Sequence, residues 1–175
     1  MLLRKTNAVI SLLCTILLID HAIFHAAWMF SGCSIPKSAI PSWILLWSMA
    51  AHAIISIVLA IRGHKGAEKR KCNGYPKMNV PTYMQRASGM ALIVFTALHV
   101  LGTVGVLQPP QIVHVILPPL FFAFALAHAA ISASKALITL GIGNVKVIKI
   151  TNIVVRMLCV MTWIADVISF YLYAV

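Results

Sequence analysis

The sequence predicts an all-α membrane protein, a bundle of five transmembrane helices. Of its 175 residues, 61% are hydrophobic and only 10% are charged, and the mean hydropathy is +0.96. A helix needs about 20 apolar residues to cross a ~30 Å hydrocarbon layer, and only helices and closed barrels satisfy their backbone there. We expect helices at about 7–30, 42–61, 85–107, 112–134 and 153–174. Little sequence remains outside them, so residues 1–175 are expected to form one membrane domain.

The first two expected helices have recognisable boundaries. The segment 7–30 follows Arg4 and Lys5 and so resembles a signal peptide. Asp20 interrupts the place where a cleavage region would lie, so we expect a retained helix. The helix at 42–61 follows an outside loop that contains glycine and prolines, and a basic residue ends it.

The last three helices follow the largest expected loop. Residues 63–83 are basic and rich in turn formers. The helix at 85–107 ends at a pair of prolines, and the helix at 112–134 becomes rich in alanine and serine. The helix at 153–174 has no histidine but carries Asp166 well inside its span.

The positive charge has a one-sided distribution. The net charge is +11, and thirteen of the fourteen basic residues fall on one side of the expected spans, with only Lys37 on the other. The positive-inside rule then predicts a cytoplasmic N-terminus and a C-terminus outside. This distribution indicates topology and contact with lipid headgroups rather than nucleic-acid binding. A docking surface for a cytoplasmic partner is the second interpretation of the same charges.

Each of the first four expected helices carries one deep histidine: His21, His52, His99 and His128. A lone membrane histidine is explained by an interhelical hydrogen bond, but four on successive helices indicate a function. Counted from the cytoplasmic charges, they form two tiers about six residues, or roughly 9 Å, apart. Each tier takes two histidines from different helices, and all four have small neighbours that leave room for a flat macrocycle. Two b-type haems with bis-imidazole ligation fit this pattern best.

The third helix opens with a distinctive stretch, QRASGMALIVFTALHVLG. It resembles the QRxTG…H segment of the five-helix, dihaem cytochrome b anchor of succinate:quinone oxidoreductases, the succinate dehydrogenases and quinol:fumarate reductases. The similarity continues in order over most of the chain, with ILLIDH at His21, MAAHA at His52 and FALAHAAIS at His128.

The resemblance implies the ligand pairs. In that family the first and third helices share the haem farther from the cytoplasm, and the second and fourth share the nearer one. By this similarity His21 and His99 are the axial ligands of the outer haem iron, and His52 and His128 those of the inner one.

The resemblance also implies contacts at the cytoplasmic mouth. By similarity, Arg86 and Ser88 are expected near the haem propionates. Lys135 is expected there on the ground of its charge alone.

The chain departs from the family pattern in several places. Some members carry a proton-conducting glutamate two residues before the fourth-helix ligand, where this chain has Leu126. Ser132 replaces a glycine that follows the same ligand, and the loops are shorter. His25 lies one turn from His21 and is its main rival as a ligand. For Asp166, proton uptake and pairing with a neighbouring helix are both open interpretations.

The expected function is electron transfer, as one subunit of an enzyme complex and without chemistry on the dicarboxylate. Flavoprotein and iron–sulfur subunits on the cytoplasmic face would exchange electrons through the two haems with a membrane quinone, for which menaquinone is expected. The expected location is the cytoplasmic membrane of a bacterium or archaeon, with multiple spans. Pairing of two complexes through the last helix is left open.

Two alternatives remain at the level of the sequence. The same kind of cytochrome b can anchor another quinone-linked reductase or dehydrogenase. A haem-free, histidine-bearing transporter belongs to a different class, and it predicts a colourless protein with more intramembrane carboxylates than Asp20 and Asp166.

Overall fold

The computed structural model describes residues 2–30, 39–69, 80–106 and 111–173. These residues form five helices and no strand: α1 (Leu2–Phe30), α2 (Ala39–Lys69), α3 (Val80–Thr103), α4 (Gln111–Leu140) and α5 (Val145–Tyr173). Every one of the five contains a stretch long and apolar enough to cross a membrane. The predicted all-helical, five-span architecture is therefore confirmed.

Three helices extend beyond the expected spans. α2 was expected to end at 61 but continues to Lys69, and α5 begins at Val145 rather than at 153. α4 likewise continues beyond 134 to Leu140. The additions to α4 and α5 lie within apolar stretches, Pro119–Leu140 and Val145–Ser169, whereas α2 continues past Arg62, where its apolar stretch ends. Lysine, arginine and glutamate are good helix formers, so a polar sequence after a membrane span can continue the helix. Hydropathy therefore locates the membrane layer and not the helix ends.

A glycine ends α3. Gly105 has a φ of +77°, a conformation that costs glycine little because it lacks a Cβ. The N–H of Val106 donates to the Leu101 carbonyl over 3.0 Å, and the N–H of Gly105 donates to the Gly102 carbonyl. These bonds satisfy carbonyls that the helix end would otherwise leave without partners.

The turn between α4 and α5 contains only residues 141–144. Gly141 has a φ of +99°, and the N–H of Ile142 donates to the Leu137 carbonyl over 3.1 Å. Asn144 then caps α5, because its Oδ1 accepts from the N–H of Lys146 over 3.0 Å. A defined C-cap followed directly by an N-cap fixes α5 beside α4.

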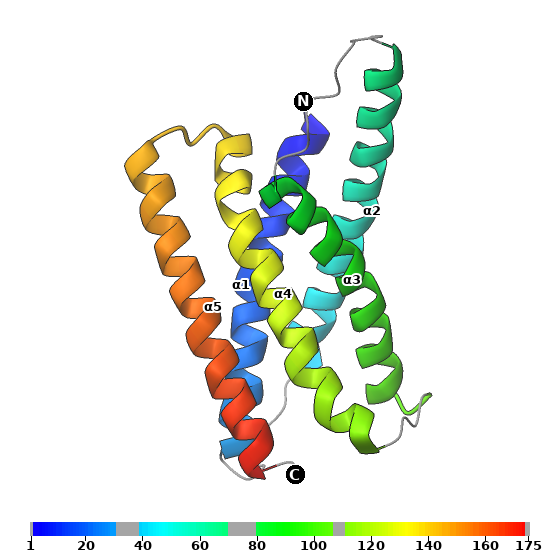
Figure 1. Cartoon of the computed structure of the whole chain (residues 1–175), viewed down its shortest axis with the longest axis vertical. Coiled ribbons are helices and arrows are strands. Elements are labelled where there is room, and N and C mark those ends of the chain that lie inside the picture. Colours follow the sequence, from blue (N-terminus) through cyan, green and yellow to red (C-terminus); the bar gives the residue numbers. More distant parts are fainter. Residues whose placement is uncertain (1, 31–38, 70–79, 107–110, 174–175) are drawn as a thin grey trace.

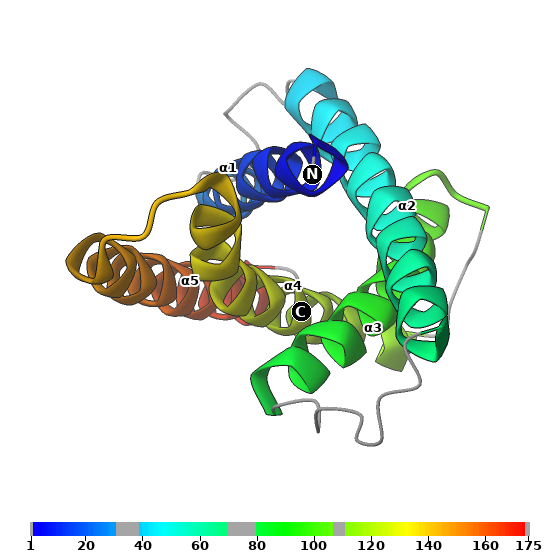
Figure 2. The ribbon, with the colours of Figure 1, turned by 90° about the horizontal axis from the view of Figure 1, so that it is seen from above.

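The helices alternate in direction, so the two chain ends lie at opposite ends of the bundle (Figure 1). The N-terminal ends of α1, α3 and α5 and the C-terminal ends of α2 and α4 lie together, and we call this end the basic end because it holds residues 4–5, 62, 86, 135 and 146–149. Seen along the bundle, α1 to α4 form a ring and α5 lies outside it (Figure 2). α5 packs against α1 and α4, while α2 packs mainly against α1 and α3 mainly against α4.

α4 is the most buried helix of the bundle. It packs against α1, α3 and α5, and its contact face is largely made of alanine: Ala125, Ala129, Ala130, Ala133 and Ala136. Small residues let helix backbones approach closely, which drives association where there is no hydrophobic effect between helices in lipid. Two larger side chains, Phe122 and Leu126, are almost fully buried and fill the core between α1 and α3.

A buried pair joins α1 to α5. Asp166 is 2% exposed, and its Oδ1 lies 2.6 Å from Nδ1 of His25. The hydroxyl of Ser169 donates to the Asp166 backbone carbonyl and is also buried. A carboxylate in hydrocarbon is costly unless it is paired. Of the two interpretations of Asp166, the structure therefore shows pairing with a neighbouring helix.

We expect Asp166→Ala to lower the free energy of unfolding in detergent by about 1–2 kcal/mol, the size of a strong interhelical hydrogen bond in a membrane. Asp166→Asn keeps an acceptor oxygen and should lose less. SDS titration followed by circular dichroism measures the difference. The matched control is Asp20→Ala, since Asp20 is the other carboxylate within the spans and is only half-buried. An equal loss in both alanine variants would contradict the assigned role of the pair.

Candidate functional site

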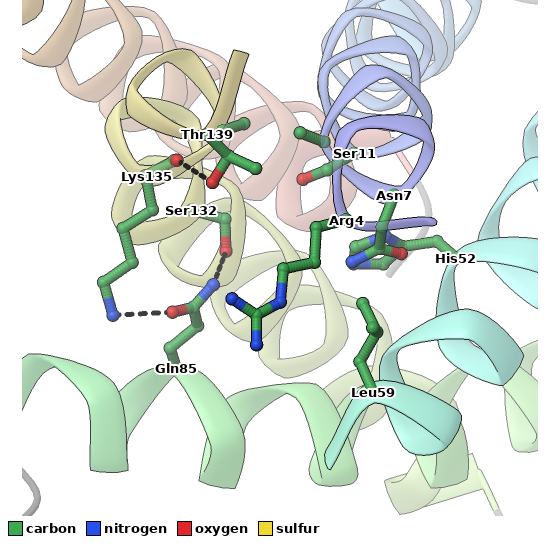
Figure 3. Close-up of a pocket in the computed structure, with 11 residues that line it drawn as sticks. Arg4, Asn7, Ser11, His52, Leu59, Gln85, Ser132, Lys135 and Thr139 are labelled. Carbon is green, nitrogen blue, oxygen red and sulfur yellow. Dashed lines mark hydrogen bonds between the residues drawn. The ribbon is translucent and has the colours of Figure 1, made fainter. Parts of the chain in front are cut away.

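A cavity of about 220 Å³ lies among α1, α2, α3 and α4 towards the basic end. Eleven side chains line it: Arg4, Asn7, Ala8, Ser11, His52, Leu59, Gln85, Ser132, Lys135, Ala136 and Thr139. Figure 3 shows Arg4 extending into the space between Gln85 and Leu59. None of the lining residues is acidic, and two are cationic, so the cavity favours a ligand with negative charge.

Gln85 connects α3 to α4 at the cavity wall. Its Oε1 accepts from Nζ of Lys135 over 2.7 Å, and its Nε2 donates to Oγ of Ser132 over 3.0 Å. Nζ of Lys135 also donates to Oγ1 of Thr82 over 3.1 Å. The Lys135 side chain is therefore held at the cavity by neutral oxygens rather than by a carboxylate.

His52 brings an imidazole from α2 to the cavity. Its Nδ1 is buried and has no hydrogen-bond partner among the described residues. An unpaired buried nitrogen is costly, so this atom marks a place where a bound group can make a contact that the polypeptide does not supply.

His128 lies against α3 at Ser88 and Gly89. Its Nδ1 is 2.9 Å from Oγ of Ser88, which is buried. A Cβ on Gly89 would come within 3.1 Å of the His128 ring. His128 also lies within electrostatic range of His52, so the structure brings the two expected inner ligands, from α2 and α4, to one region.

The outer histidines form a second group. His99 lies within electrostatic range of His21, His25 and Asp166. The ring of His99 stacks on Phe121 with centroids 5.1 Å apart, and the rings of His21 and His25 pack against Phe122 at 6.4 and 5.8 Å.

Two phenyl rings therefore link the outer histidines. Phe121 and Phe122 meet edge to face with centroids 5.5 Å apart, and both are buried. Ring contacts run from His99 through Phe121 and Phe122 to His21. Nδ1 of His21 is also 3.3 Å from Oγ of Ser42, which ties it to α2.

The structure places the residues expected at the cytoplasmic mouth in three different surroundings. Lys135 lines the cavity. Ser88 is buried against His128, and Arg86 is exposed but within electrostatic range of Lys135.

Sequence reasoning overlooked Arg4 and Gln85 as cavity residues. Arg4, Asn7 and Ser11 recur at helical spacing and so share one face of α1, and all three line the cavity. This polar stripe at the start of an apolar helix was the available signal. No group of three or more histidine, cysteine, aspartate or glutamate side chains suited to a metal ion occurs within the described residues.

Comparisons with protein-family models, with curated proteins and with solved structures find no match to this chain. The resemblance to a dihaem cytochrome b therefore depends on the quoted motifs alone.

We expect the contact between Gln85 and Lys135 to carry a coupling energy of about 1–2 kcal/mol, as for strong polar contacts between membrane helices. A double-mutant cycle of Gln85→Met and Lys135→Met, followed by SDS titration, measures it. The control combines Gln85→Met with Trp163→Phe, because the Trp163 indole bonds the Pro119 carbonyl between α5 and α4, away from the cavity. The control pair should be additive within about 0.5 kcal/mol, and additivity in the test pair would show that Gln85 and Lys135 do not interact.

Proposed function

We propose that this chain is the dihaem cytochrome b membrane anchor of a succinate:quinone oxidoreductase, and that it carries electrons between cytoplasmic flavin and iron–sulfur subunits and a membrane quinone. The observation that carries the proposal is the inner site, where the imidazoles of His52 on α2 and His128 on α4 lie within electrostatic range of each other and His52 lines a cationic cavity. The QRASG motif of α3 adds to it, because two of its residues contact one of those imidazoles.

The residues of the inner site fit a haem. His52 lines the cavity with an unpaired ring nitrogen, and His128 is held beside Gly89, where no side chain takes up space. Haem supplies one-electron chemistry when it is held by two imidazoles. Lys135 and Arg4 are the cations that would bind its propionates, and Gln85 holds Lys135 in place.

The outer site does not fit a haem in the conformation described. Phe121 and Phe122 occupy the space between His99 and His21. The second haem therefore depends on the histidine pattern and the resemblance, and it requires these two rings to turn away. His25 stays the rival of His21, because both pack against Phe122.

The basic end is the proposed cytoplasmic face. The positive-inside rule puts the N-terminus there, in the cytoplasmic membrane of a bacterium or archaeon. The same charges would attract the soluble subunits, and menaquinone is the quinone we expect. The chain itself holds and orients the haems and keeps water from them, while the partner subunits act on the dicarboxylate. An anchor of another quinone-linked reductase would use the same site.

A haem-free transporter is the second candidate, and the buried His25–Asp166 pair favours it. Ionisable pairs inside a membrane often mark proton pathways. A transporter needs no bound chromophore, so the presence or absence of haem absorbance distinguishes the two functions.

We expect a dithionite-reduced minus oxidised spectrum of the purified chain to show b-type haem at about two per polypeptide. His52→Ala and His128→Ala should each remove the same single haem, because an iron needs both axial imidazoles. His21→Ala and His99→Ala should each remove the other haem, and His25→Ala should keep both.

Two outcomes of this experiment would contradict the proposal in different ways. An absence of haem absorbance in intact membranes would reject it and favour the transporter. Loss of the outer haem in His25→Ala but not in His21→Ala would show that His25, and not His21, is the ligand that α1 supplies.

A further inference from the structure

We propose that Ser88 and Gly89 form a seat that fixes the position and the tautomer of His128 and leaves Nε2 as its metal-binding nitrogen. Ser88 thereby acts as a positioning residue rather than as a ligand of the propionates. Metal binding by Nε2 of His128 rests on the proposed function, whereas the tautomer of the ring is a property of the polypeptide alone.

The Ser88 hydroxyl has two hydrogen-bond partners. Its Oγ lies 3.2 Å from the backbone carbonyl of Gln85, which can only accept, and 2.9 Å from Nδ1 of His128. A hydroxyl has one hydrogen and two lone pairs, so it accepts from His128 when its own hydrogen goes to the Gln85 carbonyl. In the arrangement that we propose, the 2.9 Å contact is a hydrogen bond donated by Nδ1–H of His128. A neutral imidazole carries one N–H, and Nε2 is left with a lone pair.

Gly89 sets how closely the ring can approach α3. A Cβ at this position would lie 3.1 Å from Cε1 and 3.6 Å from Nδ1 of His128. Real Cβ atoms seldom come so near a neighbour, so an alanine would push the ring away from Ser88. The absence of a side chain at Gly89 and the hydroxyl at Ser88 thus act together on one imidazole.

Gln85 contacts the residues around His128 through both its backbone and its side chain. Its backbone carbonyl takes the Ser88 hydrogen, and its side chain holds Ser132 and Lys135, which follow His128 on α4 by about one and two turns. α3 and α4 are thereby tied together around His128.

His52 is held differently: its Nδ1 has no hydrogen-bond partner within the part of the chain that the structure describes, while the backbone of Asn7 is within hydrogen-bonding reach of its imidazole. A ligating histidine generally directs its second ring nitrogen to an acceptor, which fixes the tautomer and makes the ligand more basic.

The tautomer can be measured directly by ¹⁵N NMR of the full chain labelled at histidine, with the His128 signals assigned by their loss in His128→Gln. If the chain purifies with haem, the dithionite-reduced, diamagnetic state is used. We expect protonation at Nδ1 in the wild type. Protonation at Nε2 would overturn the proposal whether or not the chain binds haem.

The effect on the metal is tested with Ser88→Ala and Ser88→Thr. We expect Ser88→Ala to weaken binding of the inner haem by about 10- to 100-fold, and to raise the midpoint potential of that haem alone, because a less basic ligand stabilises ferric iron less. Ser88→Thr keeps the hydroxyl and should restore both values. The control Trp163→Phe removes an interhelical hydrogen bond to the Pro119 carbonyl, away from the cavity, and should change neither. An unchanged potential in Ser88→Ala would reject the seat.

A second pair of variants tests Gly89 within the same helix. Gly89→Ala should reproduce the loss seen in Ser88→Ala, whereas Gly102→Ala should be silent, because a Cβ at Gly102 meets nothing within 4 Å. Equal effects of the two alanines would contradict the steric role of Gly89. If the wild type holds no haem, the proposed function fails, and the NMR measurement alone decides the seat.

Discussion

A polar side chain inside this bundle is stabilised by a partner within the bundle, because hydrocarbon offers none. The whole arrangement depends on that constraint. Asn7 bonds Ser56 between α1 and α2, and Gln85 bonds α4 from α3. Each such contact joins two helices that apolar packing alone would leave free to rotate, and together they fix which faces turn inward. The histidines therefore take defined directions.

Hydropathy predicted the five spans because the cost of exposed backbone in lipid leaves long apolar helices as the only solution. It did not predict the helix end at Lys69, since charged residues can continue a helix beyond its apolar stretch, which ends at Arg62. The depth of each histidine also followed from counting along the helix. Rotation about the helix axis does not follow from counting, and that is why the contact of Ser88 with His128 and the position of Arg4 were missed.

The phenyl rings of Phe121 and Phe122 show the same difficulty. Each is an ordinary apolar residue in the sequence, and nothing in the motif indicates that both turn towards the outer histidines. Their position depends on how α4 is rotated against α1 and α3, which many small contacts set together. The cavity near His52 is similarly a property of four helices. Neither feature belongs to any one segment, so a segment-by-segment interpretation could propose candidate ligands but could not describe the space around them.

The pair between His25 and Asp166 has a consequence for biosynthesis. Its two residues are 141 positions apart in the chain, so α1 enters the membrane long before α5 exists. At 5–20 residues per second, Asp166 emerges roughly 7–28 s after His25. During that interval His25 lacks this carboxylate. The insertion of α5 therefore completes the bundle and supplies the hydrogen-bond partner of His25 on α1 in the same event.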